Sequence, residues 1–523
     1  MKHIVPFALA ALLACGAEAA ATYRNPVLPG FHPDPSICRV GKDYYLATSS
    51  FEYFPGVPIF HSRDLVHWRQ IGHALTRTSQ LQLAGQRASR GIYAPTLRCE
   101  GGRFYLITTN IDNGGNFYVT TDDPAGEWSD PVWLKEAKAW MDPSLFFDDD
   151  GKVYFTRHGG GEKGGVYQSQ IDLATGRLAE EPRPIWSGTG GVWPEGPHLY
   201  KVDGMYYLTV AEGGTSYDHA ITMARSKSPW GPFEADPRNP VQTHRDKPNL
   251  PLQATGHGDL VQTDEGRWWM VMLGIRPQYR HHHLGRETLL APVAWKDGWL
   301  EVNGGKPLAL EMSGAGLPPA HPWPAAPVRT DFTEARLGLE WTYLRAPIPH
   351  LLSLTERPGM LRLKGSADTL DDVAAPAFVA RRQQHLNMRA ATLLDFTPRA
   401  DGQTAGLVLR QNENNHYQLR IAGSPQRRVE LVARVKGVTR TVATAPLPAG
   451  PVELSIRAWP DRYEFAYRVK GASLRTLGTA PTAALSSESA GGFTGVFVGM
   501  TASGKGDMPP ADFDWFDYEP LGD

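Results

Sequence analysis

Residues 41–50 read GKDYYLATSS, a turn glycine followed by a short run of aromatic and apolar residues. The same pattern returns four more times along the chain. The further copies are GRFYLITTN from Gly102, GKVYFTRHG from Gly151, GMYYLTVAEGG from Gly204 and GRWWMVMLG from Gly266. Aromatic and β-branched residues favour strands, and the glycine favours a tight turn. Each copy follows another short apolar run, so the repeat predicts five β-hairpins.

The spacing of these hairpins indicates the fold. The turn glycines recur at intervals of 49 to 62 residues, and helical periodicity is scarce throughout. A unit of this length with several short strands is typical of one blade of a β-propeller. We therefore predict an all-β chain that begins with a five-bladed β-propeller over residues 22–320. A β-sandwich of similar length would explain the short strands, but not five similar hairpins at near-regular intervals.

A second domain is expected after the repeats. Residues 313–332, SGAGLPPAHPWPAAPVRTDF, are rich in Pro, Ala and Gly, which is typical of a linker. Alternating apolar and polar stretches follow, among them AGLVLRQ and VELVARV. They predict an antiparallel β-sandwich over residues 325–523.

The N-terminus resembles an export signal. Residues 1–21, MKHIVPFALAALLACGAEAAA, have a basic start, a short apolar run and small residues after it. We expect cleavage and export to the periplasm or the exterior; a lipoprotein signal that leaves a lipidated Cys15 is the alternative. No later segment is long and apolar enough to span a membrane as a helix. We expect Cys38 and Cys99 to be buried small apolar side chains, so that no disulfide holds the fold together.

An acidic position recurs within the repeat. Seven to nine residues before each turn glycine, the five copies carry Asp34, Ala94, Asp142, Glu195 and His257. In a propeller the first strand of each blade lines the central axis, so these positions converge on one mouth of the channel. Three crowded carboxylates repel one another and shift their pKa values apart, which predicts a functional site. A calcium site is the physical alternative, because clustered carboxylates also bind hard cations.

Longer motifs show a family resemblance. The stretch NPVLPGFHPDPSICRVGKDYYLATSSFEYFPGVPIFHSRDLVHW strongly resembles the opening of glycoside hydrolase family 43 enzymes of the β-xylosidase branch. The resemblance continues through RGIYAPTLR, WMDPSLFFDDDGKVY, WPEGPHLY, GHGDLV and LGRETLLAPVAW. It extends to LGLEWTYLRAP and AGLVLRQNENNHYQLR, which resemble the concanavalin-like β-sandwich of these xylosidases. Such enzymes are five-bladed propellers, in agreement with the repeat count.

The resemblance implies a role for each acid. It makes Asp34 the general base, Glu195 the general acid, and Asp142 the residue that raises the pKa of the acid and orients it. An inverting glycosidase needs two carboxyl groups about 6.5–9.5 Å apart, so that a water molecule fits beside the base. The acid must keep its proton near neutral pH, which a neighbouring carboxylate favours.

The resemblance also implies residues that bind the substrate. Phe51 would form an aromatic wall of the sugar pocket, Thr215 would line it, and Arg286 would donate hydrogen bonds to sugar hydroxyls. Tyr93 stands where many relatives have tryptophan, which changes the shape of the pocket. Phe493 would close the pocket from the β-sandwich, and a closed pocket implies attack at chain ends.

No cofactor is expected to be required. His257 either contacts a water-coordinated calcium or similar cation in the channel, as in some relatives, or is a satisfied core histidine. Residues 280–287, RHHHLGRE, predict a loop without zinc, because adjacent histidines on a strand point to opposite faces.

The sequence therefore predicts an exported, inverting exo-glycosidase that releases xylose from non-reducing ends of β-1,4-xylo-oligosaccharides. The alternatives are an α-L-arabinofuranosidase acting on arabinose-substituted oligosaccharides, an enzyme with both activities, or a carbohydrate-binding protein that has lost catalysis. The formal net charge of −2 gives no indication of a nucleic-acid partner. A homo-oligomer is left open.

Overall fold

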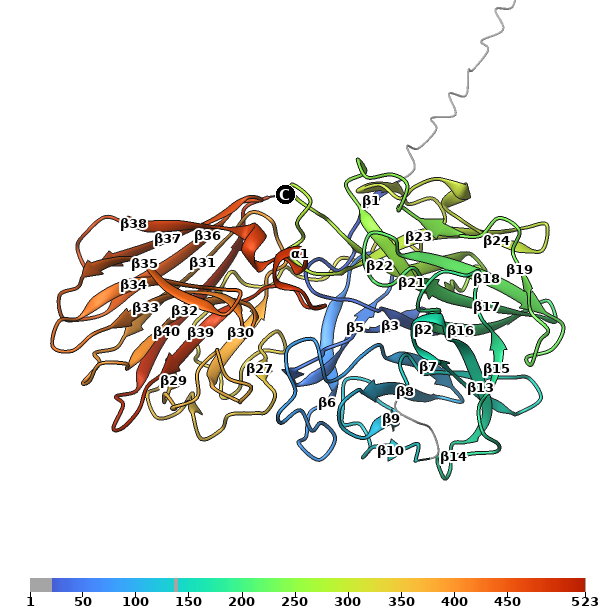
Figure 1. The fold of residues 1–523 in the computed structure, drawn as a ribbon, viewed down its shortest axis with the longest axis horizontal. Coiled ribbons are helices and arrows are strands. Elements are labelled where there is room, and N and C mark those ends of the chain that lie inside the picture. The colour runs from blue at the N-terminus through green and yellow to red at the C-terminus, as the bar shows by residue number, and fades with distance from the viewer. Residues whose placement is uncertain (1–20, 136–139, 523) are drawn as a thin grey trace, which may run out of the picture.

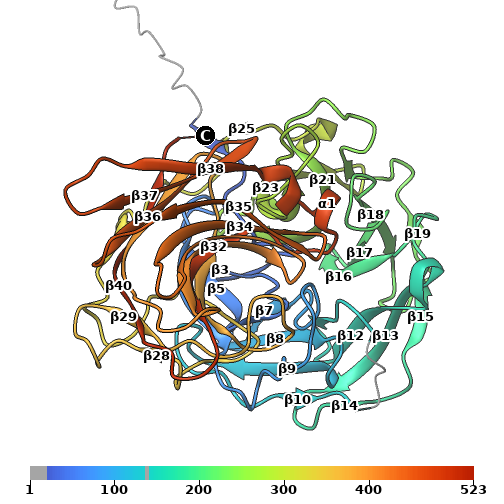
Figure 2. The ribbon, with the colours of Figure 1, turned by 60° about the vertical axis from the view of Figure 1, so that its left-hand side comes forward.

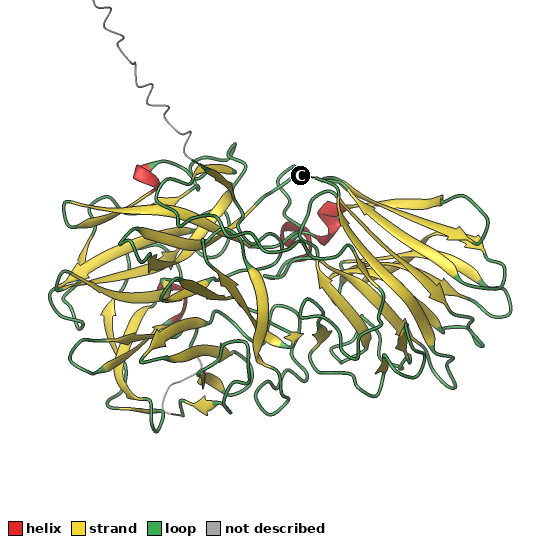
Figure 3. Ribbon diagram, turned by 180° about the vertical axis from the view of Figure 1, so that it is seen from behind, coloured by secondary structure: helices red, strands yellow, loops and turns green. Residues whose placement is uncertain are grey.

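The computed structural model describes residues 21–135 and 140–522. Cys15 and all but the last residue of the predicted export signal lie outside the described residues. Within the described part, no helix is long and apolar enough to cross a membrane. Strands make up almost all of the regular structure, and the helices are few and short (Figure 3). The chain forms an N-terminal and a C-terminal domain that lie side by side (Figure 1).

Five antiparallel sheets build the N-terminal domain. The first contains β2 (Ser36–Val40), β3 (Asp43–Ala47), β5 (Gly56–Ser62) and β6 (Arg69–Leu75). The second contains β7 (Thr96–Glu100), β8 (Arg103–Asn110), β9 (Gly115–Thr121) and β10 (Val132–Trp133). The third contains β11 (Ser144–Phe147), β12 (Val153–Gly159), β13 (Gly165–Asp172), β14 (Arg177–Leu178) and β15 (Arg183–Trp186). The fourth contains β16 (Glu195–Val202), β17 (Met205–Glu212), β18 (Ala220–Ser226), β19 (Glu234–Ala235) and β20 (Gln242–Thr243). The fifth contains β21 (Gln253–Gln262), β22 (Trp268–Ile275), β23 (Glu287–Lys296) and β24 (Trp299–Val302).

Each predicted hairpin forms the first two strands of one sheet. The turn glycines of the repeat all have positive φ, between 61° at Gly41 and 81° at Gly102. Glycine adopts this left-handed conformation without the steric cost that a Cβ atom imposes, which explains its return in every copy. The hairpin strands that follow are largely buried, in keeping with their aromatic and β-branched composition.

The first strands of the five sheets lie against one another. Strand β2 contacts both β7 and β21, β11 contacts both β7 and β16, and β16 contacts β21. Figure 1 shows β2, β7 and β16 toward the middle of the domain and the last strands β10, β19 and β24 at its margin. The residues that precede the first strands are therefore brought together. After the fifth sheet, β25 (Glu311–Ser313) returns to pair with β1 (Thr22–Arg24).

The C-terminal domain consists of two antiparallel sheets with a shared hydrophobic core, as expected for a β-sandwich. One sheet contains β26 (Arg329–Thr330), β28 (Leu352–Ser353), β29 (Leu361–Leu363), β31 (Met388–Asp395), β36 (Val452–Ala458), β37 (Arg462–Val469), β38 (Arg475–Pro481) and β40 (Ala511–Pro520). The other contains β30 (Ala377–Arg382), β32 (Thr404–Asn412), β33 (Asn415–Ala422), β34 (Arg428–Val435), β35 (Val438–Pro446) and β39 (Phe497–Ser503). Figure 2 shows these strands stacked in front of the N-terminal domain.

Short elements complete the fold. Strand β4 (Tyr53–Phe54) of the N-terminal domain pairs with β27 (Tyr343–Leu344) beyond the linker. The single α-helix of the described residues, α1 (Ser487–Ala490), follows a 3₁₀ turn at Thr482–Leu485 and lies between the domains (Figure 1). Two more 3₁₀ turns occupy Gly161–Lys163 and Asn303–Gly305.

Buried charges cross the domain interface. Glu52 of the N-terminal domain accepts a hydrogen bond of 3.2 Å from Arg410 of the C-terminal domain, and both side chains are fully buried. Arg345 pairs with Glu413 beside them. Removing one partner of such a pair leaves an uncompensated buried charge, so this cluster strongly favours one docking geometry of the two domains.

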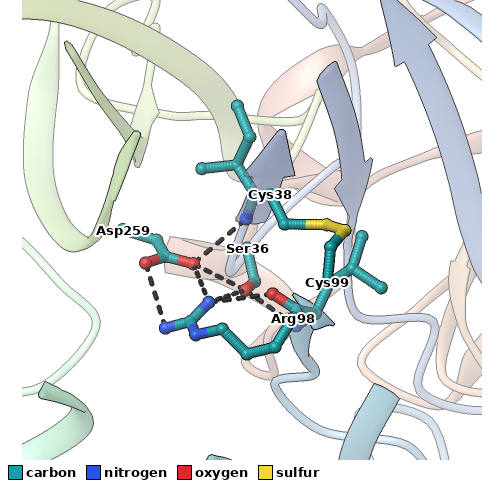
Figure 4. Close-up of a disulfide and its surroundings, with 7 residues drawn as sticks. Ser36, Cys38, Arg98, Cys99 and Asp259 are labelled. Atoms are coloured by element: carbon teal, nitrogen blue, oxygen red, sulfur yellow. Dashed lines mark hydrogen bonds and ion pairs between the residues drawn. A yellow bond between two sulfur atoms is a disulfide. The ribbon is translucent and has the colours of Figure 1, made fainter. Parts of the chain in front are cut away.

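The expectation that Cys38 and Cys99 are unbonded is wrong. The two residues form a disulfide that joins β2 to β7, the first strands of two neighbouring sheets (Figure 4). Both cysteines stand three residues before the turn glycine of their copy, so they occupy equivalent positions on adjacent strands. This equivalence is visible in the sequence and predicts the pairing.

A buried polar network lies beside the disulfide (Figure 4). Asp259 on β21 accepts hydrogen bonds from Ser36 Oγ at 2.6 Å and from Arg98 Nη1 at 2.8 Å. Tyr200 on β16 donates another at 2.6 Å. Burial by itself raises the pKa of Asp259, but the charges of Arg98 and His198 and the hydrogen bonds from Arg98 and Ser36 together outweigh it and hold the pKa well below its usual range. The network connects the first strands of four sheets.

Candidate active site

The three predicted acids stand at equivalent ends of first strands. Asp34 precedes β2, Asp142 precedes β11, and Glu195 begins β16. Asp34 and Asp142 are only 4% and 8% exposed, whereas Glu195 is half-buried. Asp34, Asp142 and His257 also share positive φ angles of 53°, 56° and 49°. Such angles are unfavourable for residues other than glycine, and they cluster at functional sites where the surrounding structure enforces them.

Asp34 is held as an acceptor. Its Oδ1 atom accepts a hydrogen bond of 2.8 Å from Arg286 Nη1, and its Oδ2 atom accepts one of 2.5 Å from Ser49 Oγ. His257 Nδ1 lies 3.6 Å from the same Oδ1 atom. A guanidinium and a hydroxyl that both donate to this carboxyl group fix its orientation and keep it a hydrogen-bond acceptor, which suits the role of a general base.

The surroundings of Glu195 favour its protonated form. Burial raises its pKa well above the usual value, the charges of Asp142 and then Asp34 raise it further, and only Arg286 opposes them. Asp142 accepts a hydrogen bond of 3.1 Å from the backbone N–H of Gly196, the residue after Glu195. Burial also raises the pKa of Asp142, against the charges of His257 and His158. Glu195, whose raised pKa favours the protonated form, thus lies near Asp34, which is held as an acceptor. This is the arrangement expected for acid–base catalysis.

The five predicted substrate-binding residues lie together. Arg286 Nη1 also donates to Thr215 Oγ1 at 2.9 Å, and its guanidinium carbon lies 5.7 Å from the ring centre of Phe51 and 5.8 Å from that of Phe493. The ring of Phe51 is 5.3 Å from that of Tyr93 and 6.2 Å from that of Phe493. Phe51 and Tyr93 are buried, whereas Phe493 is 39% exposed. Aromatic faces and an arginine beside carboxylates suit the recognition of a sugar, which offers both apolar faces and hydroxyls.

One N–H group of the Arg286 guanidinium is left for a ligand or a water molecule. It is 5% exposed, and its buried Nε atom has no hydrogen-bond partner among the described residues. Buried donors are normally satisfied, so an unsatisfied one at a site indicates a ligand or water partner.

His257 packs against the backbone next to the acid. A Cβ atom on Gly196 would lie 2.7 Å from His257 Nε2, so a larger residue there would force the imidazole or the backbone to move. Among the described residues, no group of three or more His, Cys, Asp or Glu side chains is placed to hold a metal ion. In the RHHH segment, His282 instead hydrogen-bonds Glu488 of α1 at 2.6 Å.

Two residues of the site were missed by the sequence analysis. Ser49, just after β3, faces Asp34, and His158, on β12, faces Asp142, because each continues the hairpin register opposite the acidic position. Counting the hairpin register away from the turn glycine places Ser49 opposite Asp34 and His158 opposite Asp142. This register could have identified both residues from the sequence.

Comparisons with known proteins give matches over both domains of the chain. Residues 23–300 match the glycosyl hydrolases family 43, and residues 329–519 match the beta xylosidase C-terminal concanavalin A-like domain. The chain is 48% identical over 513 residues to the non-reducing end alpha-L-arabinofuranosidase BoGH43B of Bacteroides ovatus, with 96% of each chain covered. It is 37% identical to a beta-xylosidase of Bacillus subtilis, with 95% of this chain and 99% of that one covered.

Solved structures give the same result. A Bacteroides ovatus structure described as xyloglucan PUL GH43B superposes with a TM-score of 0.92 at 47% identity, over 96% of this chain and 100% of that chain. A xylan beta-1,4-xylosidase from Bacillus halodurans superposes with a TM-score of 0.90 at 39% identity, over 95% and 100%. The resemblance inferred from the motifs is thereby confirmed, and the chain belongs to glycoside hydrolase family 43.

Proposed function

We propose that the protein is an inverting exo-glycosidase that removes one terminal pentosyl unit from a plant cell-wall oligosaccharide. The observation that carries the proposal is the contrast between two neighbouring carboxyl groups. Asp34 is anchored by Arg286 and Ser49, whereas Glu195 has a raised pKa in a half-buried position beside Asp142. A glycosidase needs one carboxyl group that accepts a proton and one that donates a proton, and these two environments support that division of roles.

The proposed reaction is a single displacement. Water attacks the anomeric carbon while the bond from that carbon to the glycosidic oxygen breaks. Asp34 accepts the proton of the water, and Glu195 gives its proton to the departing oxygen. Asp142 orients Glu195 through the Gly196 N–H. The carboxyl groups then exchange one proton through solvent before the next cycle.

The aromatic wall supports attack at chain ends. The ring centre of Phe493, from the C-terminal domain, lies 6.2 Å from that of Phe51, which supports a contribution of the sandwich to the pocket. A wall on this side favours binding of one terminal sugar over passage of a long chain. Family membership as a glycoside hydrolase also argues against a purely carbohydrate-binding role.

Two sugars are candidates for the released unit. The sequence motifs favour β-D-xylose, and relatives named beta-xylosidases support it. The relative with 48% identity is named an arabinofuranosidase, which supports α-L-arabinofuranose, and a 40% identical protein of Butyrivibrio fibrisolvens is named a xylosidase/arabinosidase. We propose activity on both, with the arabinofuranoside preferred.

Further parts of the proposal concern the fold and the compartment. The ring of contacts between first strands supports the interpretation of the five sheets as five propeller blades. The leader-like residues 1–21 and the Cys38–Cys99 disulfide support export, since structural disulfides persist in oxidising compartments. Lipidation of Cys15 and a hydrated calcium ion near His257 remain proposals from the sequence.

The test pairs two substrates with two variants. We expect the wild type to hydrolyse nitrophenyl α-L-arabinofuranoside and nitrophenyl β-D-xyloside, and the ratio of kcat/KM values ranks the two sugars. Asp34→Ala should lower kcat on the order of 1000-fold with every leaving group. Glu195→Gln should cost on the order of 100-fold with an oligosaccharide and far less with a good leaving group such as dinitrophenol. Equal, mild losses in both variants, or a wild type inactive on both sugars, would contradict the proposal.

A further inference from the structure

A segment of the C-terminal domain crosses to the N-terminal domain at the site. Residues 486–494, SSESAGGFT, include α1 and Phe493, and we refer to them as the strap. Figure 1 shows α1 between the two domains, and Figure 2 shows it close to β21. The ring of Phe493 is 39% exposed, so hydrophobic burial alone holds it weakly.

The first attachment of the strap to the N-terminal domain is Glu488 on α1. Its Oε1 atom accepts hydrogen bonds from Tyr217 Oη at 2.8 Å and from His282 Nδ1 at 2.6 Å, and its Oε2 atom accepts one from the His282 backbone N–H at 3.0 Å. The side chains of His282 and Glu488 are 13% and 21% exposed. Burial by itself raises the pKa of Glu488, but the bonds from His282 and Tyr217 outweigh it and hold the pKa at about 2. Charge-assisted hydrogen bonds of this kind are stronger than neutral ones.

The second attachment is Ser89. Its hydroxyl accepts a hydrogen bond of 2.8 Å from the backbone N–H of Phe493. The Ser89 backbone is fixed independently, because its N–H donates to Glu52 at 3.0 Å and its carbonyl accepts from the Tyr93 hydroxyl at 3.2 Å. Ser89 therefore connects Phe493 to Tyr93 and to Glu52, the residue that follows Phe51.

Close packing leaves the strap little freedom between its attachments. A Cβ atom on Gly492 would lie 2.5 Å from Ser89 Oγ, and one on Gly495, the residue that follows the strap, would lie 2.2 Å from the carbonyl oxygen of Leu284. On the side of its own domain, Gln411 donates to the Gly491 carbonyl at 3.1 Å and accepts from Thr494 Oγ1 at its own carbonyl, also at 3.1 Å.

We propose that Ser89 and Glu488 are positioning residues that hold Phe493 against the sugar pocket, and that these two attachments determine how tightly the terminal sugar binds. The inference rests on the proposed function, since it assigns Phe493 to the binding of that sugar. Neither residue contacts the three acids, so the attachments act on binding rather than on proton transfer.

The first experiment separates binding from chemistry. Ser89→Ala removes the hydroxyl but keeps both backbone hydrogen bonds of Ser89. We expect KM to rise about five- to tenfold, as for the loss of one hydrogen bond, with kcat within about threefold of wild type. Glu488→Ala should act likewise, and Glu488→Gln, which keeps an acceptor oxygen, should lie closer to wild type. Ser487→Ala is the matched control, because its hydroxyl forms no hydrogen bond among the described residues.

A double-mutant cycle tests whether Ser89 acts through Phe493. In the variant that combines Ser89→Ala with Phe493→Ala, KM should equal that of Phe493→Ala alone, because the ring that Ser89 positions is gone. Additive effects, or an unchanged KM in both Ser89→Ala and Glu488→Ala, would overturn the proposal. So would a loss confined to kcat and accompanied by a lower unfolding temperature, which is the signature of a general structural role.

Hydrogen exchange provides a readout that needs no substrate. The Phe493 amide should exchange faster in Ser89→Ala than in Ser487→Ala, because it loses its acceptor. If the wild type is inactive on both pentosides, the proposed function fails while the exchange result still tests the attachment. Equal exchange rates in the two variants would refute the attachment even in an active enzyme.

Discussion

Gly196 offers a sharp test of how the acid is placed. It follows Glu195, has a φ of 57°, and donates its N–H to Asp142. In Gly196→Ala the new Cβ atom would lie 2.7 Å from His257 Nε2, whereas ordinary contact begins at 3.4 Å. Either the imidazole moves toward Asp34, which is 3.6 Å away, or the start of β16 moves and takes Glu195 with it.

Gly196→Ala has two separate costs, one in stability and one in catalytic activity. A non-glycine residue in the left-handed region costs about 1–2 kcal/mol, which lowers stability but not catalysis. The displacement of several tenths of an ångström at the acid is the second cost. Because a misplacement of about 1 Å can cost about 100-fold in rate, we expect kcat/KM to fall on the order of 30- to 100-fold.

Gly204→Ala is the matched control. Gly204 closes the same hairpin with a φ of 77°, and no atom lies within 4 Å of the point that its new Cβ atom would occupy. Both variants should lose similar unfolding free energy in urea, while only Gly196→Ala loses activity on the nitrophenyl pentosides. Similar activity losses in the two variants, or less than a threefold loss in Gly196→Ala, would refute the reasoning.

Stereochemistry, pH dependence and the disulfide give three further tests. Proton NMR of the first-formed sugar should show inverted anomeric configuration, because single displacement needs no covalent intermediate; retained configuration would make Asp34 a nucleophile. Because the pKa of Glu195 is raised in the folded state, Glu195→Gln should raise the unfolding temperature above neutral pH; this gain should vanish below about pH 4, where Glu195 is protonated in the unfolded chain as well, and a gain independent of pH would contradict it. Replacing Cys38 and Cys99 together by alanine should lower the unfolding free energy by about 4 kcal/mol, as the chain-entropy relation gives for a loop of 61 residues, whereas an unchanged value in oxidising buffer would show that the disulfide is absent there.

The repeated hairpins and the acids before them are readable from the sequence. Turn glycines such as Gly41 and Gly204 are required by local backbone geometry, and the strands beside them are defined by local composition. Once a repeat is recognised, equivalent positions in its copies must occupy equivalent places. This symmetry alone predicts that Asp34, Asp142 and Glu195 meet at one site.

The symmetry of the repeat also relates residues other than the three acids. Cys38 and Cys99 occupy equivalent positions on neighbouring first strands, yet they were expected to be unbonded. Ser49 could also have been predicted from the sequence, because the hairpin register places it opposite Asp34. Both follow from strand pairing, which is local within a hairpin and regular between neighbouring copies.

Only the tertiary structure decided which residues attach the second domain beside the site. Ser89 and Phe493 are 404 residues apart, and Tyr217 and Glu488 are 271 apart, so no periodic pattern connects them. Their pairing depends on the docking of two separately folded domains, which the buried charges of Glu52 and Arg410 help to fix. Local sequence specifies a strand or a turn because its energy depends on neighbouring residues. A contact between domains depends on the whole surface of each, which exists only after both have folded.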